Sequence, residues 1–301
     1  PPVEVDGLSE VGFGCDCNNA GGHFGFAFQL PERWGVLRAG YGLHYAEVYP
    51  ATYQQVRFNP PAVFKIVVPN PDLVDPLGGL RIADLDPNQR STIFVNHSHL
   101  VSPYSQQYSF SWETELASHW QLQLGYVGSR SQKLFLKSYT NRAQPVDGID
   151  FTTGTVNERR PDQEHFDVRR IINTSRGYFD AARATLVVPD WRGLTVTASY
   201  WFSKAIDLGT GYTDTGAGVT SQTGRNQSEF SIHEDLKGLS TFDQSHAFLW
   251  RFQYVTPELS SRPGWLKQAL GEWNFSAVTL LKTGTPFTVL TGSDSPGFGN
   301  V

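Results

Sequence analysis

The chain has 301 residues, of which 39% are hydrophobic and 13% aromatic, and its formal net charge is -5. The hydrophobic share is low for a globular core, and no run approaches the roughly 18 to 20 apolar residues of a membrane helix, so any contact with a bilayer must be made by strands. The basic residues are scattered along the sequence, which argues against a nucleic-acid partner.

Eight segments alternate between apolar and polar residues, the pattern of β-strands whose two faces meet different surroundings. In one of them Leu122 and Leu124 fall on one face, and Gln121 and Gln123 fall on the other. The alternation lapses inside a strand only at Trp201 and in the last segment at Val278. The predicted strands cover residues 24–30, 36–45, 108–113, 120–126, 182–188, 194–202, 248–254 and 273–281.

The connections between these strands alternate in length. Short joints lie at 31–34, 116–118 and 189–192. Between them the strands are joined by long polar loops, which run from 47 to 103, from 138 to 176 and from 208 to 236. Long loops gathered at one end of an up-and-down meander are typical of transmembrane β-barrels. The sequence therefore predicts an all-β, antiparallel, up-and-down transmembrane β-barrel.

Charged and aromatic residues agree with a membrane wall. Arg38, Arg183 and Arg251 all fall on the polar faces, whereas on a lipid face near the bilayer midplane each would cost about 2 to 4 kcal/mol. Tryptophans flank the short turns, as in an interfacial girdle. They are Trp34, Trp120, Trp191 and Trp273. The alternative is a soluble two-sheet sandwich in which the apolar faces form a core.

If the wall faces lipid, its apolar face should be solvent-accessible in the isolated chain and should form a continuous band. The chain begins with Pro1 instead of methionine and ends after a glycine-rich run, so we expect part of a larger barrel: an open, curved sheet with exposed edges. The expected band includes Phe26, Tyr41, Leu122, Leu124, Leu186, Val196, Ala198, Phe248 and Phe252.

Several runs resemble one family. The strand at 36–45, VLRAGYGLHY, is similar to the LRGGYGIFYD strand of TonB-dependent outer-membrane receptors of the Oar-like group, which carry a carboxypeptidase-regulatory-like domain. Further similar runs follow in the family's order. They are NPP at 59–61, QLGYVGSR at 123–130, LTVTASYWFSKAID at 194–207, FDQSHAF at 242–248 and KTGTPF at 282–287.

The resemblance implies a barrel of about 22 strands with an N-terminal plug, opened through TonB to import a bulky solute. Residues 1–301 would then be part of a single barrel domain and contribute about eight strands. The plug, the TonB-interacting box and the regulatory-like domain would lie upstream. Trp201 and the pair Gln244 and Ser245 depart from the family's pattern without affecting the expected fold.

The first long loop carries the predicted solute-binding residues, because loops of this kind disproportionately carry function. Tyr49, Tyr53, Arg57 and Phe58 combine aromatic rings with a cation and precede a proline-rich run that stiffens the backbone. Such residues suit stacking against a sugar or an aromatic ligand. The alternative is that they only pack the loop against the mouth of the barrel.

Other combinations of residues contain the residue types of catalytic or metal sites. His97 and His99 could bind a metal but lack a third ligand at a recognisable spacing, and Asp243 with His246 lacks the nucleophile elbow of a hydrolase. Glu113 and Glu115 share a strand face and are read as a polar pair facing the lumen instead of glycosidase carboxylates. We therefore expect no enzyme activity, no metal site and no cofactor.

Cys15 and Cys17 are the only cysteines. A disulfide between them is slightly favoured in an oxidising periplasm, with a labile redox pair, a partial metal site or two free thiols as alternatives.

The predicted function is that of an outer-membrane receptor and transporter, located in the bacterial outer membrane. Its expected partners are outer-membrane lipid, an unknown solute and, through upstream regions, the TonB complex. A secreted or surface glycan-binding protein and a passive porin-like channel are the alternatives.

Overall fold

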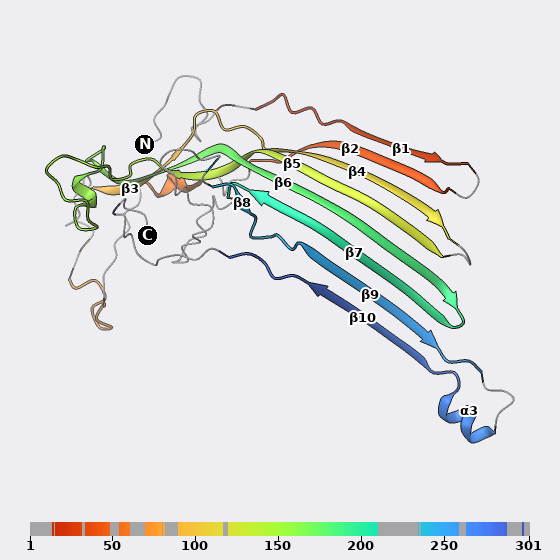
Figure 1. Ribbon diagram of the computed structural model, residues 1–301. Helices are drawn as coiled ribbons and strands as arrows, with labels where there is room; N and C mark the ends of the chain where they lie inside the picture. Colours follow the sequence, from red (N-terminus) through yellow and green to blue (C-terminus); the bar gives the residue numbers. More distant parts are fainter. Residues whose placement is uncertain are drawn as a thin grey trace.

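The computed structural model describes residues 14, 16–31, 34–48, 54–60, 70–79, 81, 90–116, 120–209, 234, 236–258, 263–287 and 297. These residues form one curved sheet of ten strands (Figure 1). The strands are β1 (His23–Gln29), β2 (Val36–Tyr45), β3 (Ser91–Asn96), β4 (Tyr104–Glu115), β5 (Gln121–Tyr139), β6 (His165–Trp191), β7 (Leu194–Asp207), β8 (Gly238–Leu239), β9 (His246–Val255) and β10 (Asn274–Lys282). The helices are η1 (Gln54–Phe58), η4 (Val156–Glu158) and α3 (Gly264–Leu270).

The wall of the sheet is an antiparallel meander in the order β1-β2-β4-β5-β6-β7-β9-β10. All eight strands predicted from the alternation are present, and the predicted all-β fold is confirmed. Within the described residues β1 and β10 each pair with a single neighbour, so the sheet stays open and has two unpaired edges. The expected open sheet is therefore confirmed as well.

The two remaining strands lie off this path; β3 falls in a predicted loop, and β8 just after the predicted loop 208–236. β3 sits inside the predicted loop 47–103 and pairs in parallel with the first part of β6, and the two-residue β8 pairs with β7. β3 has no alternation to detect, because its sequence, STIFVN, is half-buried throughout. Its partners are other protein segments on both sides, not lipid on one side and water on the other.

The predicted loop 138–176 was also wrong at its second half, because β6 already begins at His165. β5 and β6 run past their neighbours and continue to pair there, with register shifts between Ser131 and Leu136. This part of β6 alternates poorly since it lies beyond the apolar band. At the opposite end, the connection from 256 to 273 is longer than the other turns and contains α3 (Figure 1).

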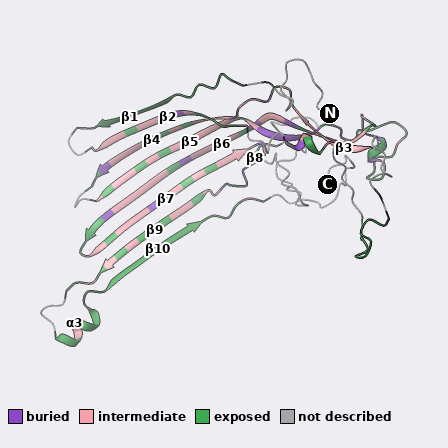
Figure 2. Ribbon diagram, turned by 180° about the vertical axis from the view of Figure 1, so that it is seen from behind, coloured by how far each residue is buried: buried purple, intermediate pink, exposed green. Residues whose placement is uncertain are grey.

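Buried residues concentrate where β5 and β6 extend past the other strands (Figure 2). Leu100, Phe135 and Ile171 form the largest cluster there, and Val48 packs against it. The wall itself has no core of its own. All nine residues of the predicted band remain half-buried or exposed, and they do not meet across a second sheet. The eight-stranded meander is therefore a membrane wall, and the two-sheet sandwich is excluded.

No helix among the described residues is long and apolar enough to cross a membrane.

Candidate functional site

One face of the wall carries continuous apolar rows. The register places Phe110 opposite Tyr126 and Leu124 opposite Ala184, so residues of the same phase continue from strand to strand. Leu124 is 40% exposed and Phe202 52% exposed. We call this the lipid face. Two of its rows are Phe26, Ala39, Phe110, Tyr126, Ala182 and Phe202, and Phe28, Leu37, Trp112, Leu124, Ala184, Tyr200 and Phe248.

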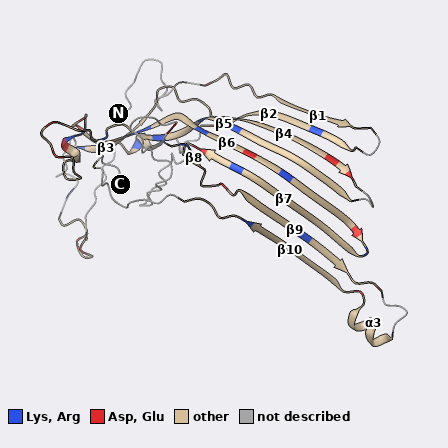
Figure 3. Ribbon diagram, viewed as in Figure 1, with Lys and Arg blue, Asp and Glu red and all other residues tan. Residues whose placement is uncertain are grey.

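The opposite face is polar, and we call it the lumen face. Arg38 lies 3.4 Å from a carboxylate oxygen of Glu113, and Gln123 donates a hydrogen bond to the other oxygen. Arg183 lies over the ring of Trp201 at 5.3 Å, which explains the one aromatic exception to the alternation on β7. Charges are sparse along the wall and more frequent at the loop end (Figure 3). The predicted placement of the wall arginines on the polar phase is confirmed by the register.

The predicted tryptophan girdle lies at the turn end of the wall. Trp120 directly precedes β5 and Trp191 ends β6, and their rings meet edge to face at 6.3 Å. Trp34 accepts a hydrogen bond at its carbonyl from Trp112 Nε1, and Trp273 stacks on Phe275. These side chains mark one boundary of the bilayer, because tryptophan prefers the interface between lipid and water.

A second boundary appears at the loop end. Counting along β5 on the lipid face, Arg130 is the first charged residue after Trp120, ten residues further on. At about 3.3 Å per residue and a tilt of about 40° this spans roughly 25 Å, the height of the apolar band in outer-membrane barrels. The wall is therefore the right height for the outer membrane.

Tyrosines and charges gather at this second boundary, all on the lipid face. Asp180 binds Arg130 through both carboxylate oxygens, at 3.0 and 2.9 Å, and accepts hydrogen bonds from the hydroxyls of Tyr108 and Tyr126 at 3.2 and 2.5 Å. The Arg130 guanidinium also lies over the rings of Tyr108 and Tyr178. Sequence analysis missed this group, although extending the phase of β5 from Tyr126 to Arg130 would have found it.

The predicted binding residues of the first loop are only partly described. Tyr49 and Tyr53 lie outside the described residues. Arg57 and Phe58 belong to η1, both are exposed, and the guanidinium lies over the ring at 4.7 Å. The structure thus brings this pair together, and their role in binding stays a prediction.

Asn59, directly after η1, fastens this helix to the sheet. Its amide nitrogen donates to the carbonyl of Phe94 at 2.8 Å, and its amide oxygen accepts from the backbone N–H of Phe94 at 2.7 Å. The side chain thereby imitates a strand neighbour along β3. This gives a physical role to the NPP run that resembles the receptor family.

The loop between β5 and β6 is built around two buried arginines. Arg159 is 1% exposed and donates to the carbonyls of Thr152 and Gly297 at 2.9 and 2.7 Å. Arg160 donates to the carbonyl of Asn141 at 2.5 Å and pairs with Asp167 at 2.9 Å. We call the part of the molecule around residues 141–167 the loop-end layer; it is a packed unit outside the membrane.

Possible metal ligands lie in this region, but some of them form hydrogen bonds with neighbouring residues. His97 and His99 have ring centroids 5.9 Å apart, and His97 Nδ1 accepts the backbone N–H of His99. Asp162, Glu164 and His165 place one ligand atom each within 4.8 Å of one another. His165 Nδ1 lies 2.6 Å from the Asp162 carboxylate, and this hydrogen bond holds the pKa of Asp162 below its ordinary value.

The serine, aspartate and histidine residues at 240–246 do not assemble into the catalytic triad of a hydrolase. Asp243 is buried and accepts hydrogen bonds from the backbone N–H of Ala205 at 2.7 Å and from the Ser245 hydroxyl at 2.9 Å. His246 instead binds the Tyr200 hydroxyl at 2.7 Å on the lipid face. Asp243 therefore fixes the turn before β9 to the end of β7.

Replacing this carboxylate tests that role. We expect Asp243→Ala to lower the stability of the complete protein by about 1.5 to 3 kcal/mol, because the N–H of Ala205 loses a charged acceptor. Asp243→Asn, which keeps one oxygen acceptor, should cost less. Urea unfolding from lipid vesicles measures both, and equal losses for the two variants would contradict the assignment.

Cys17 is disulfide-bonded, and Cys15 is the only other cysteine in the sequence. Cys15 itself lies outside the described residues. The structure thus has Cys17 in a disulfide, and its pairing with Cys15 stays a prediction.

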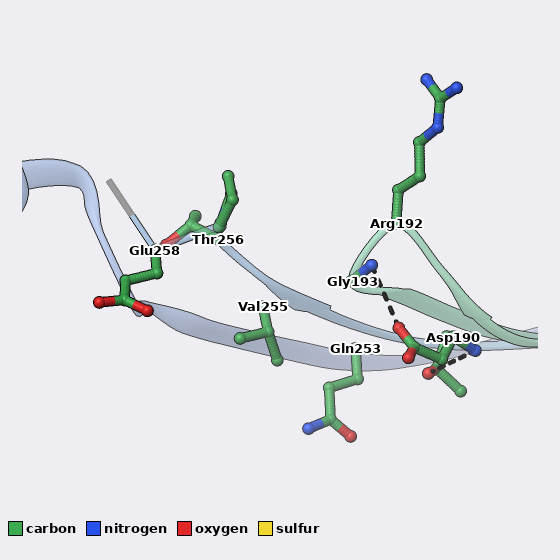
Figure 4. Close-up of a pocket in the computed structure, with 9 residues that line it drawn as sticks. Asp190, Arg192, Gly193, Gln253, Val255, Thr256 and Glu258 are labelled. Carbon is green, nitrogen blue, oxygen red and sulfur yellow. Dashed lines mark hydrogen bonds between the residues drawn. The ribbon is translucent and has the colours of Figure 1, made fainter. Parts of the chain in front are cut away.

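A hollow of about 540 Å³ lies at the turn end, between the β6–β7 turn and the exit of β9. Figure 4 shows that Arg192 points away from it and that the Asp190 carboxylate is bound by the backbone N–H of Gly193, at 3.2 Å. Among the polar groups of this hollow, Asp190 and Thr195 hold the turn, in which Asp190, Arg192 and Gly193 all have positive φ.

Comparison with known proteins agrees with the geometry of the wall. A family described as an outer membrane beta barrel domain matches residues 3–301. No curated protein matches the chain. Among solved structures, the outer membrane transporter YddB from Escherichia coli is similar with a TM-score of 0.42 and 8% identity, over 81% of this chain and 31% of that one. The chain thus spans less than a third of that transporter. With a family match over almost its whole length and a wall of matching height, the chain belongs to the outer membrane beta barrel domain family and lies in the outer membrane.

Proposed function

We propose that this chain is the barrel portion of a TonB-dependent receptor that imports a bulky solute. The observation that carries the proposal is the open wall: eight long strands with a polar lumen face and two unpaired edges. Unpaired backbone groups are not tolerated in lipid, so further strands must complete the barrel. A barrel well above eight strands encloses an aqueous lumen or a plug, whereas eight strands leave room only for side chains.

The order of the family-like runs adds support. The run at 194–207 is the whole of β7, and FDQSHAF at 242–248 contains the carboxylate that anchors β9 to β7. The NPP run supplies the Asn59 bond to β3. These three of the runs that resemble the receptor family therefore have a defined structural role in this fold.

A passive porin-like channel is the alternative, since its wall would have the same two faces. The complete protein in lipid vesicles separates the two functions. A plugged receptor should give no swelling of vesicles in small sugars and should bind a purified TonB C-terminal domain. Swelling at porin-like rates together with no TonB binding would overturn the proposal.

The first long loop can be tested for solute capture by deleting residues 49–90. The barrel should still assemble, because the deletion removes no wall strand and long loops change the free energy of closure little. Val48, which packs against the cluster of Leu100, Phe135 and Ile171, is retained. We expect binding and energised uptake of the receptor's own solute to fall in cells that express both forms at matched levels.

Loss of the Asn59 contact to β3 is a second consequence of this deletion, so Asn59→Ala in the intact loop is the matched control. Unchanged solute binding in the deletion would assign recognition to the plug or to other loops. A loss that Asn59→Ala reproduces in full would assign it to the position of the loop instead of its aromatic residues.

A further inference from the structure

We propose that the loop end of the lipid face holds a binding site for the phosphate of an anionic lipid headgroup. The site consists of Tyr126, Arg130, Tyr178, Asp180, Lys204 and Lys237, which we call the tyrosine-cation cluster. It comes from four neighbouring strands or their ends and is independent of how the barrel transports solute.

The register fixes five of these residues on the lipid face, and Lys237 contacts one of them. Tyr126 belongs to an apolar row, and Arg130 lies four residues further along β5, so it has the same phase. Arg130 is paired in register with Tyr178, and Asp180 with Lys204. Lys237, next to β8, places its ammonium over the ring of Tyr178 at 5.5 Å. The cluster is therefore continuous across β5, β6, β7 and the approach to β8.

The cluster carries an excess of positive charge that its own carboxylate does not absorb. Asp180 accepts hydrogen bonds from Tyr108, Tyr126 and Arg130 at Oδ1 and a further one from Arg130 at Oδ2, so its single negative charge is already paired with Arg130. Lys204 is exposed beside it. Three cations face one carboxylate, and the two lysine ammonium groups are the ones left to meet an external anion.

The position of the cluster selects a lipid over a free anion. Directly below it, toward the turn end, lies the apolar row with Tyr126, Ala182 and Phe202, which suits acyl chains. The height of roughly 25 Å from Trp120 puts Arg130 at the level of the headgroups. A ligand that meets both surfaces has a phosphate above and hydrocarbon below, and basic groups at that level bind anionic headgroups.

The test uses the complete protein in detergent micelles, with lipid A as the probe and with dephosphorylated lipid A and inorganic phosphate as comparisons. Lys204→Gln combined with Lys237→Gln removes the two available cations and keeps side-chain length. Lys267→Gln with Lys282→Gln is the matched control, because Lys267 lies in α3 at the turn end and Lys282 follows the lumen phase of β10.

We expect the cluster variant to bind lipid A about 20- to 30-fold more weakly, given the contribution of each surface cation, and the control variant to bind as the wild type does. Dephosphorylated lipid A should bind all three proteins equally weakly. The heat-dependent electrophoretic shift of a folded barrel shows whether each variant is folded. Equal affinity of the cluster variant and the wild type, equal losses in both variants, or displacement of lipid A by millimolar inorganic phosphate would overturn the proposal.

Discussion

Leu124→Arg should destabilise the complete barrel by about 2 to 4 kcal/mol, because it places a charge in hydrocarbon. Leu124 is 40% exposed on the lipid face and lies between Trp120 and Arg130, near the middle of the apolar band. Its row continues through Trp112 and Ala184, so the side chains directly opposite it on the adjacent strands offer no acceptor to the guanidinium. Folding titrations of the complete protein into lipid vesicles measure the free energy of unfolding.

Gln123→Arg is the matched control, one residue away on the lumen face. Gln123 donates to Glu113, and an arginine at this position can keep a bond to the same carboxylate. We expect a change close to zero. Since a shift of one residue exchanges the two faces of a strand, a larger penalty at 123 than at 124 would show that the phase of β5 is reversed, and equal penalties would contradict the assignment of the two faces.

The wall could be predicted from the sequence because a membrane imposes a strict requirement on it. Each strand must show apolar side chains to lipid and avoid charges there, so the alternation at residues 120–126 and 194–202 survives with the single exception of Trp201. The stacking of Arg183 over that ring accounts for the exception. Outside the bilayer the requirement ends, and the pattern ends with it.

β3 and the first part of β6 show this limit. His165, Asp167 and Arg169 share one face of this strand and Arg170 interrupts the other, because these side chains meet the loop-end layer instead of lipid. Their pairing with β3 and β5 depends on contacts distant in the sequence, which local periodicity does not record. The same reason explains why the buried Arg159 and Arg160 look like ordinary loop residues in the sequence.

The candidate sites were predicted less completely than the wall. Of the four loop residues, Arg57 and Phe58 stack on each other, and the sequence offers no sign of the Asn59 contact that positions them. The tyrosine-cation cluster was missed for a different reason: Tyr126 was taken as the end of a strand that continues to Tyr139. Because the predicted strand ended at Tyr126, the lipid-face position of Arg130 at the membrane boundary was not recognised.

The loop-end layer provides the other large expected effect, through Arg160→Ala. The Arg160 side chain is 5% exposed, and it pairs with Asp167, whose side chain is 16% exposed. Removing one partner of a buried pair leaves the other charge uncompensated, which costs about 3 to 5 kcal/mol. Arg169 remains 3.8 Å from Asp167 and compensates in part, so we expect a loss near the lower limit, about 3 kcal/mol.

This loss should be confined to the loop-end layer, because Arg160 contacts Asn141, Asn157 and Asp167 and none of the apolar rows of the wall. Hydrogen exchange of the complete protein in micelles should become faster across residues 141–167 and stay unchanged in the membrane part of β5 and β7. Arg170→Ala removes the same charge from an exposed position on β6 and should change little. If Arg160→Ala instead accelerated exchange throughout the wall strands, the layer and the barrel would be one cooperative unit, and deleting loops would disturb transport by weakening the wall itself.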